Sequence, residues 1–367
     1  MIDFFQPTEP FSAQTLRLAG EAGNGGGEVF EIAELCRTLK IGDVEGWVAA
    51  WLALGERVDA EARAAESAGH RYTSVTRSFH AAQYFRQSDV FTPGGDPRRA
   101  EAFRRSQSSF RRAARLHQPE IRTIEVRDVD ATYDGYLCLP AVAPGTKVPG
   151  VFLIGGADSY AEENYFSGRG LVDRGMAMLL LDTPGRGSAI YLKGMPTRYD
   201  YEVPTRVALD WLAAQPEIDA DRLGLVGISL GGYYAPRAAA FDARVKALVC
   251  WSGIMQLLPD IYDYFPHIQG QLRWITGAKD DAEARALLRA YDLTDVAPKI
   301  TCPTFVTHGR ADRIMDVRGA ERFFAALGSA DKTLRIYEGP GQMHCSYDDW
   351  RHSGAEMFDW MGDKLTE

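Results

Sequence analysis

The chain has 367 residues, of which 46% are hydrophobic and 25% are charged, and its formal net charge is −9. These values are typical of a soluble globular protein with one large domain and a smaller one. The negative charge argues against a general nucleic-acid binder and against attachment to an anionic membrane surface.

No targeting segment is predicted. Residues 1–14 lack a basic region followed by a long apolar core, so no signal peptide is expected. No window reaches the roughly 18 uninterrupted apolar residues of a transmembrane helix. The cysteines are scattered, odd in number and without zinc-binding spacing, which favours a cytoplasmic location and no metal site. They are Cys36, Cys138, Cys250, Cys302 and Cys345.

Residues 1–118 are predicted to form a helical N-terminal domain. Apolar residues recur at helical spacing in 47–58, and Gly69 is expected to end that helix. The segment 92–97 (TPGGDP) breaks the helical pattern, and an arginine-rich helix follows it. We interpret these arginines as a solvated helix face, because an RNA-binding arm would not suit an acidic chain.

Residues 119–367 are predicted to form a catalytic domain in which strands alternate with helices. This alternation indicates a mostly parallel sheet covered by helices and preceded by an antiparallel pair of strands. Residues 252–298 lack a strong strand and are rich in aromatic residues, so we interpret them as an insertion after the sixth strand. Ligands bind at this edge of such sheets. The predicted strands are 121–126, 133–139, 148–154, 176–181, 223–226, 247–251, 304–308 and 333–337.

The stretch Gly227–Gly231 (GISLG) lies between a strand and an alanine-rich helix, which is the setting of a nucleophile elbow. Ser229 would occupy a sharp turn, and a bulky residue two places away on either side would clash. The N-terminus of the following helix would favour an oxyanion. We therefore predict that Ser229 is a nucleophile; the alternative is a chance glycine turn around a buried serine.

An acid and a base are predicted from chain order, which runs nucleophile, acid, base in α/β hydrolases. Asp312 follows the seventh predicted strand, and His344 lies in a Gly/Pro-rich loop after the eighth. His344 would take the Ser229 proton, and Asp312 would hold the imidazole in the required tautomer. Asp316 is the rival acid, but we interpret it as the cap of the next helix.

The oxyanion hole is expected to use two backbone N–H groups. One belongs to Leu230, the residue after the nucleophile. The other belongs to the loop after strand 148–154, where Gly156 and Ala157 are equal candidates. A tight turn without any such role would leave the same glycines in the sequence.

Together these motifs resemble the α/β-hydrolase family over residues 120–367. The helical N-terminal region and the segments GGADS, DTPGRG, GISLGGYYAPRAAAF and HGRAD are similar to one group in particular. It contains 2,6-dihydroxypseudooxynicotine hydrolase and fungal polyketide-shortening hydrolases of the yellowish-green pigment type. The resemblance implies cleavage of a carbon–carbon bond beside a ketone, and a helical domain that covers the active site. Nearby FrsA-like proteins are described as esterases.

We therefore expect a cofactor-independent serine hydrolase that forms an acyl-enzyme. The small-molecule substrate would be aromatic or polyketide-like, and the favoured reaction is cleavage beside the ketone of a 1,3-diketone-like compound. A carboxylesterase, an acyltransferase and a non-catalytic ligand-binding relative are the alternatives. A homodimer is an open alternative to a monomer, and no nucleic-acid or membrane partner is expected.

Four side chains are candidates for substrate binding. The aromatic ones would contact an extended leaving group, and the carboxylic acid would help to protonate a carbanion. They are Trp251, Asp260, Tyr262 and Trp274, and the same segment also offers Tyr264 and Phe265 for the aromatic pocket.

Overall fold

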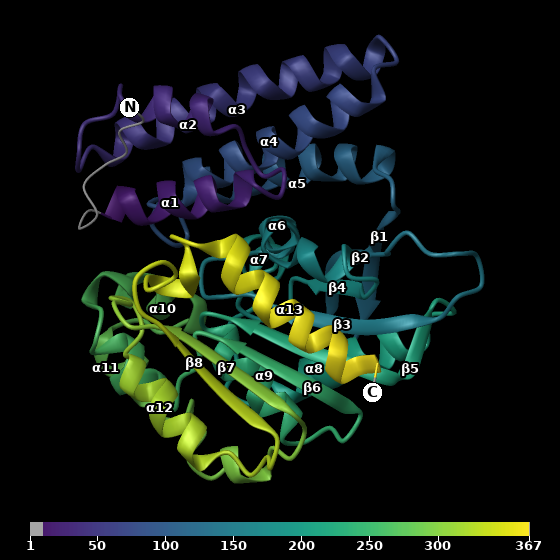
Figure 1. Ribbon diagram of the computed structural model, residues 1–367. Coiled ribbons are helices and arrows are strands. Elements are labelled where there is room, and N and C mark those ends of the chain that lie inside the picture. The colour runs from purple at the N-terminus through teal and green to yellow at the C-terminus, as the bar shows by residue number, and fades with distance from the viewer. Residues whose placement is uncertain (1–9, 367) are drawn as a thin grey trace.

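The computed structural model describes residues 10–366 (Figure 1). Part of the segment on which the signal-peptide prediction rests therefore lies outside the described residues. Among the described helices, none has the length and apolar character needed to cross a membrane.

A single eight-stranded sheet has the order β1-β2-β4-β3-β5-β6-β7-β8. The pairs β1–β2 and β2–β4 are antiparallel, and all other neighbours are parallel. The mostly parallel sheet with an antiparallel beginning, as predicted, is confirmed. The strands are β1 (Ile121–Arg127), β2 (Thr132–Cys138), β3 (Val148–Ile154), β4 (Ala177–Leu181), β5 (Ile218–Ile228), β6 (Val245–Trp251), β7 (Thr304–Gly309) and β8 (Lys332–Tyr337).

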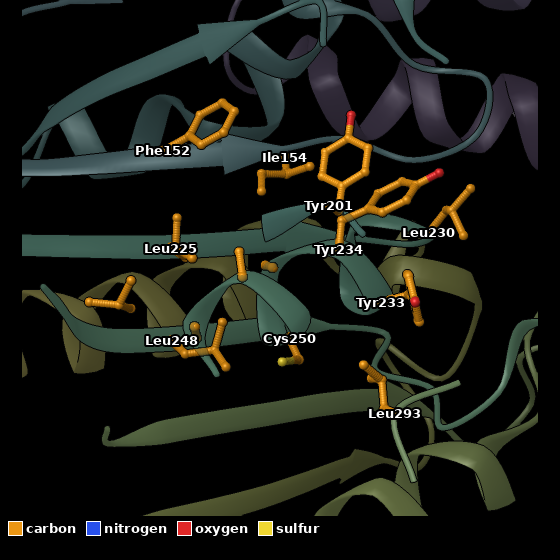
Figure 2. Close-up of a cluster of buried hydrophobic side chains, with 14 of the residues drawn as sticks. Phe152, Ile154, Tyr201, Leu225, Leu230, Tyr233, Tyr234, Leu248, Cys250 and Leu293 are labelled. Atoms are coloured by element: carbon orange, nitrogen blue, oxygen red, sulfur yellow. The ribbon is translucent and has the colours of Figure 1, made fainter. Parts of the chain in front are cut away.

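Helices cover both faces of the sheet because its central strands are apolar throughout. Every residue of β3 and β4 is buried, so neither face can meet water. One face packs against α8 (Glu202–Ala213), α9 (Gly231–Ala239) and α12 (Val317–Ala326). The other packs against α6 (Ala161–Val172) and α13 (Trp350–Thr366). Figure 2 shows side chains of β3, β5 and β6 meeting tyrosines of α9 in the first of these cores.

Within residues 10–366, five helices precede the sheet, and they form a layer on one side of it (Figure 1). Trp47 and Trp51, predicted on one helical stripe, are fully buried in the core between these helices. The helix that carries them ends at Ser67, just before Gly69 with its φ of 76°. The helices are α1 (Pro10–Ala22), α2 (Val29–Cys36), α3 (Val44–Ser67), α4 (Arg71–Asp89) and α5 (Pro97–Leu116).

Most arginines of α5 form ion pairs at its surface, as Arg98 does with Glu45 and Arg105 with Glu56. Arg99 differs, because it is only 3% exposed and points toward the rest of the protein. The solvated face inferred from the sequence therefore does not include Arg99.

The segment between β6 and β7 forms short helices, and the described residues there include no strand. A π-helical turn (Leu258–Tyr262) precedes α10 (Gln269–Thr276) and α11 (Asp281–Leu288). The side chain of Trp274 on α10 packs edge-on against Tyr191, which ends the short helix α7 (Gly187–Tyr191). This segment thus follows the sixth strand, as expected, and reaches across the sheet edge toward the N-terminal helices.

Candidate active site

Ser229 lies in the turn between β5 and α9 with a φ of 56°, a left-handed conformation that is uncommon for serine. A Cβ atom on Gly227 would lie 2.1 Å from the carbonyl oxygen of Gly231. One on Gly231 would lie 2.1 Å from the carbonyl oxygen of Ile154. The two glycines are therefore required by close backbone contacts on either side of the serine, the physical reason inferred from the sequence.

His344 contacts both Ser229 and Asp312. Its Nε2 atom lies 3.0 Å from Ser229 Oγ, and its Nδ1 atom lies 2.8 Å from Asp312 Oδ2. The other carboxylate oxygen of Asp312 accepts hydrogen bonds from the backbone N–H groups of Ile314 and Met315, at 2.8 and 2.9 Å. The fold thus brings together three side chains that are far apart in the sequence, because His344 is 32 residues from Asp312 and 115 residues from Ser229.

The electrostatics of this group favour a charged Asp312 beside His344. Burial alone would raise the pKa of the Asp312 carboxyl, but the imidazole of His344 and backbone N–H groups hold that pKa below its usual value. Burial opposes a charge on His344, yet the negative charge of Asp312 raises the pKa of the imidazole well above its ordinary value. An imidazolium formed at His344 is therefore stabilised by its buried carboxylate partner.

The rival residues occupy other positions. Asp316 caps α12 by accepting the N–H of Arg318 at 2.9 Å, as inferred from the sequence. His308 is buried with Nδ1 3.1 Å from the Gly309 carbonyl oxygen, and its Nε2 is 3.8 Å from Asp312. The Sγ atom of Cys345 lies 3.4 Å from Nε2 of its sequence neighbour His344.

The 155–159 loop, which follows β3, lies against the serine. A Cβ atom on Gly156 would be 3.0 Å from Ser229 Cβ and 3.2 Å from its Oγ. Ala157 and Leu230 both line the cavity into which Ser229 opens. All three predicted oxyanion residues are therefore adjacent to Ser229 or to its cavity.

The cavity beside Ser229 and His344 has a volume of about 170 Å³. Its walls are mainly apolar and come from the N-terminal helices, the 155–159 loop, the segment between β6 and β7, the loop before α12, and residues next to Ser229 and His344. Polar side chains also reach the cavity, among them Arg17, Asp158 and Gln271. The lining includes Gln14 and Arg17 of α1, Val90 and Phe91 after α4, Ile261, Phe265, His267, Ile268, Gln271 and Leu272 of the segment after β6, and Ile314, Met315 and Tyr347.

None of the four side chains expected to bind substrate lines this cavity, which corrects that expectation. Side chains alternate between the two faces of a strand, and that of Trp251 lies on the face of β6 covered by α13. Its ring packs 5.6 Å from that of Trp350. Asp260 accepts the backbone N–H groups of Met255 and Gln256 and forms an ion pair with Arg322.

The other two are also engaged elsewhere. The hydroxyl of Tyr262 donates to Asp281 at 2.7 Å. The ring of Trp274 lies 4.5 Å from the guanidinium carbon of Arg99. Phe265, which the sequence also offered among the aromatic residues of this segment, does line the cavity, whereas Tyr264 does not.

Among residues 10–366, no group of three or more His, Cys, Asp or Glu side chains has an arrangement that could hold a metal ion.

Comparison with known proteins places the chain among hydrolases. The model of the prolyl oligopeptidase family matches residues 170–367, and that of the FrsA-like esterases matches residues 37–265. The chain is 37% identical over 256 residues to the α/β hydrolase gkaG of Penicillium citrinum, a match that covers 67% of the chain and 60% of gkaG. It is 31% identical to the 20-hydroxy-prefusarin hydrolase of Gibberella moniliformis over 90% of each protein. Among solved structures, that of 2,6-dihydroxy-pseudo-oxynicotine hydrolase is similar with a TM-score of 0.84, at 25% identity over 95% of each chain.

Proposed function

Because the chain belongs to the α/β hydrolases, with matches to both the FrsA-like and prolyl oligopeptidase families, we propose that it is a serine hydrolase. Ser229 is the nucleophile, His344 the general base and acid, and Asp312 the residue that orients the imidazole. The observation that carries this proposal is the continuous contact from Ser229 Oγ to His344 Nε2 at 3.0 Å and from His344 Nδ1 to Asp312 at 2.8 Å.

The proposed reaction begins with attack of Ser229 Oγ on a substrate carbonyl carbon while His344 takes the hydroxyl proton. The resulting oxyanion is bound by the N–H of Leu230 and by that of Gly156 or Ala157. Collapse of the tetrahedral intermediate expels the leaving group, to which His344 returns the proton. Water activated by the same imidazole then releases the acid from the acyl-enzyme.

The proposed substrate is a compact, largely apolar carbonyl compound. A cavity of about 170 Å³ with mainly aliphatic and aromatic walls favours such an acyl group. Arg17 lines the cavity but pairs with Asp158 and Glu163, so no uncompensated charge of this arginine attracts an anionic substrate. Two similar proteins are named for the compounds that they hydrolyse, 20-hydroxy-prefusarin and 2,6-dihydroxy-pseudo-oxynicotine.

We favour cleavage of a carbon–carbon bond beside a ketone. In that reaction the leaving group is an enolate, which must be protonated at carbon, and His344, whose Nε2 lies 3.0 Å from Ser229 Oγ, is placed to deliver that proton. A carboxylesterase is the second candidate, because the FrsA-like family that matches residues 37–265 is described as an esterase family.

Matched aryl 1,3-diketones and aryl esters of equal size separate these two reactions by their kcat/KM. We expect the diketones to be preferred. An advantage of the esters by more than about 10²-fold, which is about 2.7 kcal/mol of transition-state preference, would identify an esterase. The Ser229→Ala variant should lose both activities, since both begin with the same nucleophile.

A further inference from the structure

The 155–159 loop is held by residues from outside the sheet and its covering helices. The side-chain amide of Gln271, on α10, donates from Nε2 to the carbonyl oxygen of Ala157 at 2.7 Å. This bond joins the segment after β6 to the backbone that carries a proposed oxyanion N–H.

The orientation of the Gln271 amide is set by Arg99 of α5. Arg99 Nη1 donates to Gln271 Oε1 at 2.8 Å, and a guanidinium can only donate. The oxygen must therefore face Arg99, which leaves the N–H₂ group of Gln271 to face Ala157. Arg99 is itself fixed, because its guanidinium lies over the rings of Trp274 and Tyr191, at 4.5 and 5.1 Å.

The next residue of the loop, Asp158, is held from two more N-terminal helices. Arg17 of α1 donates to both carboxylate oxygens at 3.2 and 3.1 Å. Arg86 of α4 donates to Oδ2 at 3.0 Å and to the Asp158 carbonyl oxygen at 3.3 Å. The Arg86 side chain is fully buried, and both arginines also pair with Glu163 of α6.

The rest of the loop is anchored within the sheet domain. Each peptide plane couples a carbonyl to the N–H of the next residue. The bond from Arg186 to the Gly155 oxygen, at 3.2 Å, therefore directs the Gly156 N–H. Among the contacts of the described residues, only that from Ser159 Oγ to the Gly156 oxygen, at 3.4 Å, directs the Ala157 N–H. The hydrogen bonds from Gln271 to the Ala157 oxygen and from Arg86 to the Asp158 oxygen hold the two peptide planes that follow. They therefore restrict rotation of the weakly held peptide between Gly156 and Ala157.

We propose that Gln271 is a positioning residue for the oxyanion hole, and that the N-terminal helices act on catalysis through it and through Asp158. This inference rests on the proposed function. Oxyanion donors are effective only when they are aimed at the position of the developing charge, and displacement of a supporting bond lowers transition-state stabilisation without changing ground-state binding.

The kinetic signature of such a role is a fall in kcat and in kcat/KM by the same factor, with KM unchanged. Removing a whole oxyanion donor costs about 10²- to 10³-fold, so loosening one should cost about 10- to 100-fold. A residue that only shaped the cavity wall would instead raise KM.

Two substitutions test this with the full-length protein. Gln271→Glu keeps the size of the side chain and the acceptor for Arg99, but it places an oxygen against the Ala157 carbonyl. Gln271→Met removes the donor without that repulsion. Both should lower kcat by about 10- to 100-fold with KM within about threefold of the parent. Affinity for an aryl trifluoromethyl ketone, which forms a tetrahedral oxyanion on the serine, should fall in parallel, while affinity for the product acid stays constant.

Gln269→Met is the matched control. Gln269 lies on the same helix and donates to the Tyr262 carbonyl oxygen at 2.9 Å, a bond within the segment after β6. This variant should keep kcat within about twofold of the parent. Values of kcat within threefold of the parent for both Gln271 variants, or a rise in KM alone, would overturn the inference. Full activity of Ser229→Ala would instead overturn the proposed function, so the two failures are distinguishable.

Discussion

The contact between His344 and Asp312 predicts a pH profile. The base must be neutral to accept the Ser229 proton, and Asp312 raises the pKa of His344 above its ordinary value. The acid limb of kcat/KM should therefore have an apparent pKa above that of a free imidazole, about 6.5. Asp312→Asn removes the charge, so burial dominates and the limb should move to lower pH while kcat falls about 10³- to 10⁴-fold. An acid limb at the same pH in this variant would contradict the assignment.

A single methyl group at Gly156 tests how closely the 155–159 loop approaches the nucleophile. The added carbon would lie 3.0 Å from Ser229 Cβ, so the loop or the serine must shift. Gly156→Ala should retain its folded far-UV circular dichroism spectrum and lose about 10- to 100-fold in kcat, as expected when an oxyanion donor is displaced.

Gly270→Ala on α10 provides the control, because nothing lies within 4 Å of its added carbon. Activity of Gly156→Ala equal to that of Gly270→Ala would show that the loop is not part of the site.

Which site residues the sequence could reveal depends on what determines their positions. Ser229, Asp312 and His344 follow parallel strands, whose carboxyl ends share one edge, so chain order and loop context were enough to expect them together. Trp251 was misplaced because its side chain points to the α13 face of β6, which apolar composition alone does not indicate. Gln271 carries no local signal, because its role depends on Arg99, 172 residues away in the chain.

Among the elements, α6 carries two fully buried glutamates in its first turn. Burial and the negative charge of Asp182 raise the pKa of the Glu162 carboxyl above its ordinary value. The carboxyl accepts a hydrogen bond from the Tyr136 hydroxyl at 2.6 Å, which an amide oxygen can also accept.

A carboxyl with a raised pKa binds an extra proton in the folded state. Its contribution to stability is therefore lost as the pH rises from the ordinary glutamate pKa of about 4.3 toward the raised value. The glutamine of the Glu162→Gln variant does not titrate. The melting temperature of the variant minus that of the parent should therefore increase as the pH rises. Thermal melts from pH 4 to pH 9 test this, and a difference that stays constant or shrinks with pH would contradict it.

Most strand ends were predictable to within two residues because β3, β4, β6 and β7 are short apolar runs between turn signals. The exception is β5, which begins at Ile218 rather than Leu223, because its first residues include the mostly polar run Asp219–Arg222. Element boundaries at glycines were equally clear, as at Gly69 after α3. What could not be predicted is the contact between elements far apart in the chain, such as α10 against α5, because it depends on the complete tertiary arrangement.

At the scale of the whole molecule, the N-terminal helices share a hydrophobic core with the face of the sheet that α6 and α13 cover. The Phe110 ring lies 5.3 Å from Phe79, 4.7 Å from Tyr136 of β2 and 5.4 Å from Tyr165 of α6. A boundary near residue 118 remains a prediction, and this continuous packing indicates that the two sides unfold together.

Thermal unfolding should therefore be a single transition when followed by far-UV circular dichroism and by tryptophan fluorescence. Phe110→Ala should lower both midpoints together, with a loss of about 3–5 kcal/mol in the free energy of unfolding. Loss of the helical signal well before the fluorescence change would show that the N-terminal helices are an independently folding unit.

The central claim is that Ser229 is the nucleophile, and covalent labelling tests it most directly. A fluorophosphonate should add one equivalent to the protein, and peptide mass spectrometry should place it on Ser229 alone, because only this serine has an imidazole at 3.0 Å with a carboxylate behind it among the described residues. Ser229→Ala should take up no label and retain a folded spectrum. Labelling of another residue at the same rate in this variant, with turnover preserved, would contradict the account.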